Sequence, residues 1–290
     1  MDKKIGLFWL RDDFRITKNH GLAEATKNHD QVVVFYLYKK STFNNQEAQQ
    51  WWLNKSLLSF QKKLNNFNIS LEIIKTNSFK LFFDNLLKKK DISIYWNKVY
   101  EPEYLKFDKY LTKSLVAANN PFKICKGNLL NEIDEIKKSD GTPFKVFTPF
   151  WRNAEKYYIE KIPAKEKTIK KCLRKKDYFQ NCIDPKEILP KKKWFKNFEN
   201  LWSPSEESAL KELHNFIKNR ILNYSEGRNF PNIIGTSKLS PFIKFGQIHV
   251  ETIWNECSKA KNKTIGTSKF LAEIGWREFN HTLMPNRLNM

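Results

Sequence analysis

The chain has 290 residues, of which 40% are hydrophobic and 14% aromatic, and its formal net charge is +21. This length and hydrophobic content suffice for a real core and exclude wholesale disorder. The excess of lysine and arginine predicts a polyanionic partner such as nucleic acid, although an AT-rich coding sequence would also enrich lysine and asparagine.

The sequence indicates neither a membrane protein nor a metal-binding protein. No window approaches the roughly 18 apolar residues of a membrane span, and the first apolar run is too short for a signal peptide. The four cysteines form neither a CxxC pair nor a zinc-ligand spacing with the five histidines. We therefore expect a soluble, cytoplasmic, monomeric protein with reduced thiols, no metal site and no membrane partner.

The first third of the chain alternates short apolar runs with amphipathic stretches. Strands are predicted at 5–10, 31–38, 69–75 and 92–100, and helices between them at 20–27, 46–67 and 78–90. The run "QVVVFYLY" has no polar face, as expected for a parallel strand buried on both sides. The alternation predicts a parallel sheet covered by helices, and no GxGxxG fingerprint follows the first strand.

The remaining sequence predicts a linker and a helical region. Residues 131–200 are basic, irregular and rich in proline and aromatics, which favours a linker between a domain at 1–130 and one at 201–290. Ser203 and Glu206 match a capping box with Pro204 at the first helical position. Further helices are predicted at 247–258 and from a cap at Thr267 or Ser268.

The loop "GTSKLSPFIKFG" at 235–246 gathers three hydroxyl side chains in front of a proline. Ser240 suits an N-cap and Pro241 a first helical residue, so the loop would end at the partly positive start of a helix. Such a site holds a phosphate or pyrophosphate, with the hydroxyls of Thr236, Ser237 and Ser240 beside it. A plain capped turn between two helices is the alternative.

The last predicted helix carries four chemically useful residues on one face. Glu273, Trp276, Arg277 and Asn280 stand at i, i+3, i+4 and i+7. Together they can stack on a nucleobase and hydrogen-bond to it. The alternative is an exposed Glu273–Arg277 ion pair with Trp276 in the core.

These segments occur together and in an order that resembles the DNA photolyase/cryptochrome family. The motifs are "YSEGRNFPNIIGTSKLSPFIKFGQI" at 224–248, "FLAEIGWREFNHTL" at 270–283, "LFWLRDDFRITKNHGLAEA", "YWNKVYEP" and "GTPFKVFTPFWR". The resemblance, which covers nearly the whole chain, is to class I-like deoxyribodipyrimidine photolyases. It implies a Rossmann-like, antenna-type α/β domain followed by an all-α domain that binds FAD.

The resemblance also implies roles for individual residues. Glu273 and Trp276 match catalytic positions that hydrogen-bond to a flipped-out pyrimidine dimer and pack against it. The implied FAD-binding positions, with the phosphates at 236–240, are Tyr224, Thr236, Ser237, Lys238, Leu239, Ser240, Phe270, Glu273, Arg277 and Asn280. The implied DNA-binding positions are Arg228, Glu273, Trp276 and Arg277.

By resemblance, the expected function is light-driven repair of UV-damaged DNA, in which excited reduced flavin donates an electron that splits a cyclobutane dimer. Family members continue well beyond Met290, so we expect a C-terminally truncated chain with an incomplete helical domain and weak or no FAD binding. A blue-light photoreceptor of the cryptochrome type without repair activity, or an inactive remnant, is the alternative. The antenna chromophore, folate or deazaflavin, stays unassigned, because only Glu103 suggests a folate contact.

Overall fold

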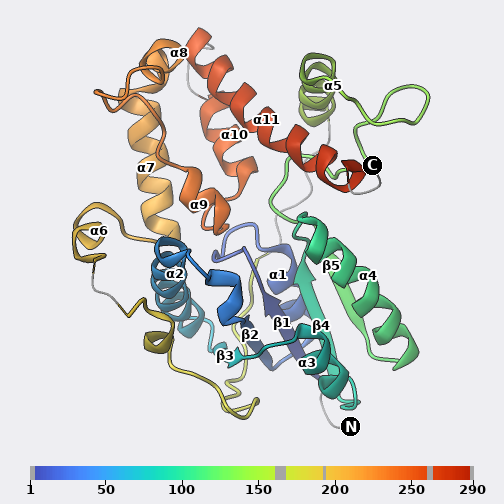
Figure 1. Ribbon diagram of the computed structural model, residues 1–290. Coiled ribbons are helices and arrows are strands. Elements are labelled where there is room, and N and C mark those ends of the chain that lie inside the picture. The colour runs from blue at the N-terminus through green and yellow to red at the C-terminus, as the bar shows by residue number, and fades with distance from the viewer. Residues whose placement is uncertain (1–3, 161–167, 192–193, 260–263, 288–290) are drawn as a thin grey trace.

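The N-terminal part of the computed structural model is a five-stranded parallel sheet (Figure 1). The structure describes residues 4–160, 168–191, 194–259 and 264–287. The strands are β1 (Ile5–Leu10), β2 (Val32–Tyr38), β3 (Ser70–Lys75), β4 (Ile92–Asn97) and β5 (Phe122–Cys125), in the order β3-β2-β1-β4-β5. The predicted parallel sheet is confirmed, and β5 is a strand that the sequence pattern did not indicate.

Helices cover both faces of this sheet because the central strands β1, β2 and β4 are buried on both sides. Phe8 and Val34 contribute to one buried cluster with α1 (His20–Asn28) and α2 (Glu47–Asn65). Trp9 and Phe35 contribute to another with α3 (Phe79–Leu86) and α4 (Pro102–Ala117). The 3-10 turn η1 (Lys40–Phe43) leads from β2 into α2.

The region expected to be an irregular linker contains ordered structure. Its elements are α5 (Phe147–Glu160), η2 (Pro185–Ile188) and α6 (Lys196–Leu201). The expectation failed at α5 because Pro149 lies in the first helical turn, where a missing N–H costs nothing. Phe150 of α5 is buried against the last helix of the chain.

From Glu206 onward the described residues form helices, as predicted. These are α7 (Glu206–Asn219), η3 (Ile221–Asn223), α8 (Tyr224–Gly227), α9 (Ser240–Lys244), α10 (Val250–Lys259) and α11 (Ile265–Arg287).

The predicted caps of α7 and α11 were wrong. Ser205, rather than Ser203, caps α7 by accepting a hydrogen bond from the Ser208 N–H at 3.1 Å. The hydroxyl of Thr264 accepts the N–H of Thr267 at the start of α11, so neither Thr267 nor Ser268 is the cap. In both cases a nearer hydroxyl satisfies the first-turn N–H groups.

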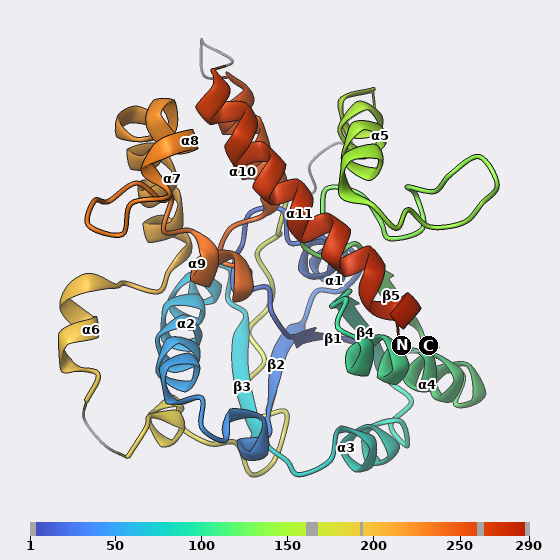
Figure 2. The ribbon, with the colours of Figure 1, turned by 45° about the horizontal axis from the view of Figure 1, so that its top comes forward.

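The helical part lies against the carboxyl ends of the strands (Figure 2). Phe14 donates its N–H to the Phe245 carbonyl at 3.2 Å, and Arg15 donates to the Gly246 carbonyl at 3.0 Å. Gly246 has φ +60°, and a Cβ there would lie 1.9 Å from the Asp12 carbonyl oxygen. Only glycine permits this close approach between the loop after β1 and the turn after α9.

Among the residues that the structure describes, no helix is both long and apolar enough to cross a membrane.

Candidate functional site

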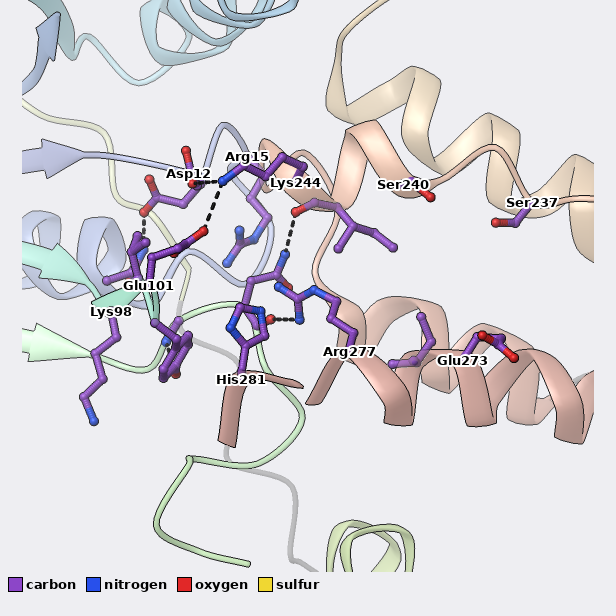
Figure 3. Close-up of a pocket in the computed structure, with 18 of the residues that line it drawn as sticks. Asp12, Arg15, Lys98, Glu101, Ser237, Ser240, Lys244, Glu273, Arg277 and His281 are labelled. Carbon is purple, nitrogen blue, oxygen red and sulfur yellow. Dashed lines mark hydrogen bonds and ion pairs between the residues drawn. The ribbon is translucent and has the colours of Figure 1, made fainter. Parts of the chain in front are cut away.

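A cavity of about 550 Å³ lies between the carboxyl edge of the sheet and the helical part (Figure 3). It opens beside the ends of β1 and β4. The strand order reverses at this point, because β2 lies on one side of β1 and β4 lies on the other. Ligands of open parallel sheets bind at such a reversal of strand order. The cavity therefore has a sheet-edge wall and a helical wall.

The helical wall is formed by residues from three segments, which are α8, the hydroxyl loop and α11. The ring of Tyr224 in α8 meets that of Phe270 in α11 edge to face, with centroids 5.2 Å apart. Six predicted cofactor positions line the cavity, namely Tyr224, Ser237, Ser240, Phe270, Glu273 and Arg277. The wall thus combines aromatic surface with hydroxyl and charged groups, as small-molecule sites do.

The hydroxyl loop is built differently from its prediction. Ser240 is the first residue of α9, and its N-cap is Leu239, so the predicted Ser240 cap was wrong. The Ser237 hydroxyl accepts the N–H of Leu239 at 3.3 Å, and Lys238 has φ +55°. This geometry turns the chain before Ser240 and directs Ser237 and Ser240 to the cavity (Figure 3).

Four predicted cofactor positions lie outside the cavity lining. Thr236 and Lys238 are exposed in the loop, and Leu239 is fully buried in the core. Asn280 is exposed on α11. The loop turns between Ser237 and Ser240, so a motif that spans five consecutive residues contributes only two side chains to this wall.

The sheet-edge wall contains a charged cluster that sequence reasoning missed. Lys244 of α9 donates to Asp12 at 3.0 Å and to Glu101 at 3.1 Å (Figure 3). The carboxylate of Asp12, followed by that of Glu101, raises the pKa of Lys244. The available signal was the position of Asp12 and Glu101 shortly after buried parallel strands, where the ends of β1 and β4 meet.

Arg277 and His281 form the floor between the two walls. Arg277 donates to the Asn128 carbonyl at 2.7 Å, which ties α11 to the loop after β5. Burial lowers the pKa of His281 to about 4, with the charge of Arg277 acting in the same direction. The Nδ1 atom of His281 is buried and has no hydrogen-bond partner in the described part of the chain. A neutral imidazole is thereby left to face a ligand.

Glu273 lies at the mouth of the cavity, in an ion pair with Arg228. The Arg228 guanidinium also lies 5.3 Å from the centroid of the Tyr224 ring. The alternative Glu273–Arg277 ion pair is not what the structure contains. Two residues predicted to contact DNA thus contact each other beside an aromatic wall of the cavity.

Trp276 is 42% exposed and lies outside the cavity lining and the core. Its indole stacks on the ring of Phe147 of α5, with centroids 3.8 Å apart and planes 8° apart. The predicted shared face of α11 therefore divides. Glu273 and Arg277 face the cavity, whereas Trp276 presents a flat aromatic surface to solvent beside it.

Comparisons with known proteins agree on one family. The family model for DNA photolyase matches residues 6–167. The chain is 30% identical over 285 residues to the deoxyribodipyrimidine photo-lyase of Agrobacterium fabrum, covering 96% of this chain and 58% of the relative. It is 27% identical over 313 residues to cryptochrome-2 of Arabidopsis thaliana, covering 99% of this chain and 49% of the relative.

Structural similarity points the same way. A bacterial class III photolyase from Agrobacterium tumefaciens superposes with a TM-score of 0.87 at 28% identity. That match covers 99% of this chain and 60% of the other. The chain thus spans about half to three fifths of the length of these relatives.

Proposed function

Because the chain belongs to the DNA photolyase family, we propose that it serves the light-driven, FAD-dependent splitting of cyclobutane pyrimidine dimers in UV-damaged DNA. The observation that carries this proposal is the convergence of α8, the hydroxyl loop and α11 on one cavity. Under the proposal, residues 1–130 form the antenna-type domain, 131–200 connect the domains, and 201–290 belong to the FAD-binding helical domain.

The residues of the cavity fit a flavin nucleotide. Its volume of about 550 Å³ falls within the range of about 300–1,000 Å³ found for ligand sites. Ser237 and Ser240 would donate hydroxyl hydrogen bonds to the phosphates, and Tyr224 and Phe270 offer apolar surface to a planar ring. The unpartnered Nδ1 of His281 supports the same assignment, since buried polar atoms normally have a partner.

When bound, the flavin would supply the light-driven electron transfer that ordinary side chains cannot perform. The protein's own contribution is positioning. Glu273 would hydrogen-bond to the extruded lesion at the cavity mouth, and the exposed indole of Trp276 would stack on it. Extruding a base costs a few kcal/mol, less when the base is already unpaired. The excess of basic residues would hold the flanking phosphates.

The second candidate is a photoreceptor without repair activity, because a cryptochrome is also among the relatives of this chain. The exposed Trp276 and the acidic Glu273 beside the cavity favour repair, because a sensor needs no surface that receives a base. Loss of dimers from an irradiated oligonucleotide, scored in light and in dark, separates the two. Light-dependent loss supports repair, and equal loss in light and dark supports the sensor.

Flavin binding is best tested with matched serine and threonine variants. The full chain is titrated with FAD while flavin fluorescence is followed. The full chain is expected to bind FAD weakly, and Ser237→Ala with Ser240→Ala should weaken that binding about tenfold or more, since about 1.4 kcal/mol corresponds to a factor of ten. Thr236→Ala, on the exposed side of the same loop, should leave binding unchanged. Equal effects of the two variants would refute the assignment of this wall to the phosphates.

A further inference from the structure

A second feature lies at the opposite edge of the sheet from the cavity. Residues 168–180, here called the strap, have no helix or strand of their own, yet they cross the amino edge of the sheet. Figure 1 shows this edge on the side where the chain begins, away from α9 and α11. The strap belongs to the region predicted to link the two domains, and most of its basic side chains are exposed as predicted, but its backbone is hydrogen-bonded to the sheet and to α1.

The strap is bound to one element after another along this edge. Its Lys170 N–H donates to the Thr26 hydroxyl at 3.1 Å in α1, and its Leu173 N–H donates to the Asp30 carbonyl at 2.7 Å. Farther along, the Ser70 hydroxyl of β3 donates to the Lys175 carbonyl at 2.6 Å. The N–H groups of Tyr178 and Phe179 reach Glu72 at 3.0 and 2.7 Å.

The strap passes from one face of the sheet to the other. Cys172 belongs to the buried cluster under α1 and α2, whereas Tyr178 and Phe179 pack against the cluster under α3 and α4. These apolar side chains anchor it, while the basic residues of its sequence "KKCLRKK" at 170–176 point outward or lie half-buried. Position and orientation of a basic segment are therefore fixed by the fold.

Further cations surround the strap. The side chain of Lys89 lies over the Tyr178 ring, 4.4 Å from its centroid, and Lys90 donates to the Ala118 carbonyl at 2.9 Å. Neither contact neutralises the charge. We call the amino-edge surface the set Lys4, Lys27, Lys88, Lys89, Lys90, Lys170, Lys171, Arg174, Lys175 and Lys176.

The cations of the amino-edge surface differ in pairing from those at the cavity side. Within the described ranges, none of these ten cations forms an ion pair with an acidic side chain, although Asp91 and Asp177 belong to the same loops. By contrast, Lys18, Lys126 and Lys244 each have a carboxylate partner. Exposed lysines without a carboxylate partner also occur elsewhere in the described chain, for example Lys106 and Lys211, so the amino edge differs in that one anchored segment holds several of them together.

We propose that the amino-edge surface is a second nucleic-acid contact, which binds the phosphate backbone of duplex DNA on the side opposite the cavity. From β3 to β4 the edge spans about 14 Å, at about 4.8 Å per strand. A duplex carries about one charge per 1.7 Å when both strands are counted, so this length of duplex contains about eight phosphates, and those on one side face the surface. The surface consists of lysines and one arginine, which we expect to contact phosphates, so binding should be independent of sequence.

A membrane surface fits less well. Interfacial segments insert a row of apolar side chains below their basic ones. In the strap, Leu173 is the exposed large apolar residue, at 59%, and the other apolar side chains face the sheet. Duplex DNA is therefore the partner that the surface fits.

The test compares two variants of the full chain with the same change in charge. The strap variant replaces Lys170, Lys171, Arg174, Lys175 and Lys176 with Gln. The control variant replaces Lys106, Lys109, Lys113, Lys211 and Lys218, which are exposed on α4 and α7. The affinity for an undamaged duplex of about 12 base pairs is measured at several salt concentrations. The logarithm of the affinity should fall with the logarithm of the salt concentration by about 0.9 per phosphate contact.

In the strap variant we expect the slope of the salt dependence to fall by at least two and the number of duplexes bound per protein to fall by one. Both quantities should change little in the control variant. Equal losses in the two variants would reduce the effect to net charge and overturn the proposal. So would binding of the wild type to phosphatidylserine vesicles but not to the duplex.

If the strap variant fails to fold, a second measurement on the wild type still tests the proposal. In the wild type, duplex DNA should protect Lys170, Lys171, Lys175 and Lys176 from acetylation but not Lys106 and Lys109. Absence of protection overturns the proposal. None of these readouts involves flavin or light, so failure of the repair function would be seen separately.

Discussion

The two edges of the parallel sheet handle charge in opposite ways. At the carboxyl edge, cations are matched by carboxylates across elements, as Lys244 is by Asp12 and Glu101, and Lys126 by Glu251. At the amino edge, the strap and the loops around it carry cations without carboxylate partners among the described residues. The carboxyl edge is covered by the helical part, whereas the amino edge lies on the side away from those helices (Figure 1).

The difference follows from burial. A charge removed from water must find a partner, because an uncompensated buried ion costs several kcal/mol. A solvated lysine needs none and stays available for an external anion. The carboxyl edge therefore uses its charges to hold two parts of the molecule together, and the amino edge presents its charges to a partner.

The largest expected effect is at the buried pair of Arg11 and Asp108. Arg11 donates to Asp108 at 2.9 Å, and both residues are under 10% exposed. Asp108→Ala should lower the free energy of unfolding by about 3–5 kcal/mol, because it leaves a buried charge alone. Urea denaturation measures this.

Two further variants sharpen that result. Adding Arg11→Met to Asp108→Ala should recover part of the loss, since no lone charge remains. Asp84→Ala, which removes the exposed partner of Lys80, should change stability little. A similar loss in both aspartate variants would abolish the contrast between buried and solvated charges.

A smaller effect is expected from pH at Glu278. Burial raises its pKa to about 7, although the Arg277 charge and the N–H groups of Leu130 and Asn131 oppose this. The folded state then holds a proton between the unfolded value of 4.5 and about 7, so stability falls as pH rises through that window. The loss is about 3 kcal/mol at 1.36 kcal/mol per pKa unit.

The variant Glu278→Gln should remove this pH dependence. The difference in unfolding free energy between wild type and variant, measured by urea denaturation from pH 5 to pH 8, should slope downward with pH. Parallel curves for the two proteins would mean that Glu278 stays ionised in the fold throughout that range.

The smallest effect is expected at the amino edge. Lys175→Gln with Lys176→Gln should change the unfolding free energy by less than about 0.5 kcal/mol, as exposed substitutions away from special features do. Thermal unfolding at low salt measures it. A large loss would mean that these charges support the strap itself, and the contrast between the two edges would disappear.

Much of this molecule was predictable from local patterns. Runs such as that at 31–38 were identified as buried parallel strands because an uninterrupted apolar stretch of strand length has few other solutions. The residues of α8, the hydroxyl loop and α11 were predicted through motifs, and six of them do line one cavity. Helix caps were predicted less well, since several hydroxyls compete for the same N–H groups.

The charged cluster of the sheet-edge wall could not be predicted from local patterns. Lys244 meets Asp12 across 232 positions and Glu101 across 143. No periodicity within a window encodes such a contact. The strap was missed for a related reason, because its backbone bonds to the sheet edge and to helix ends instead of to itself.

The sequence by itself determined the parallel sheet, the helical second part, the family and the residue types offered to a ligand, because apolar periodicity and short motifs act within a few residues. Only the tertiary structure decided which of those side chains share a cavity and which cations find a carboxylate. Those outcomes depend on where burial brings distant segments together, and burial is a property of the assembled fold.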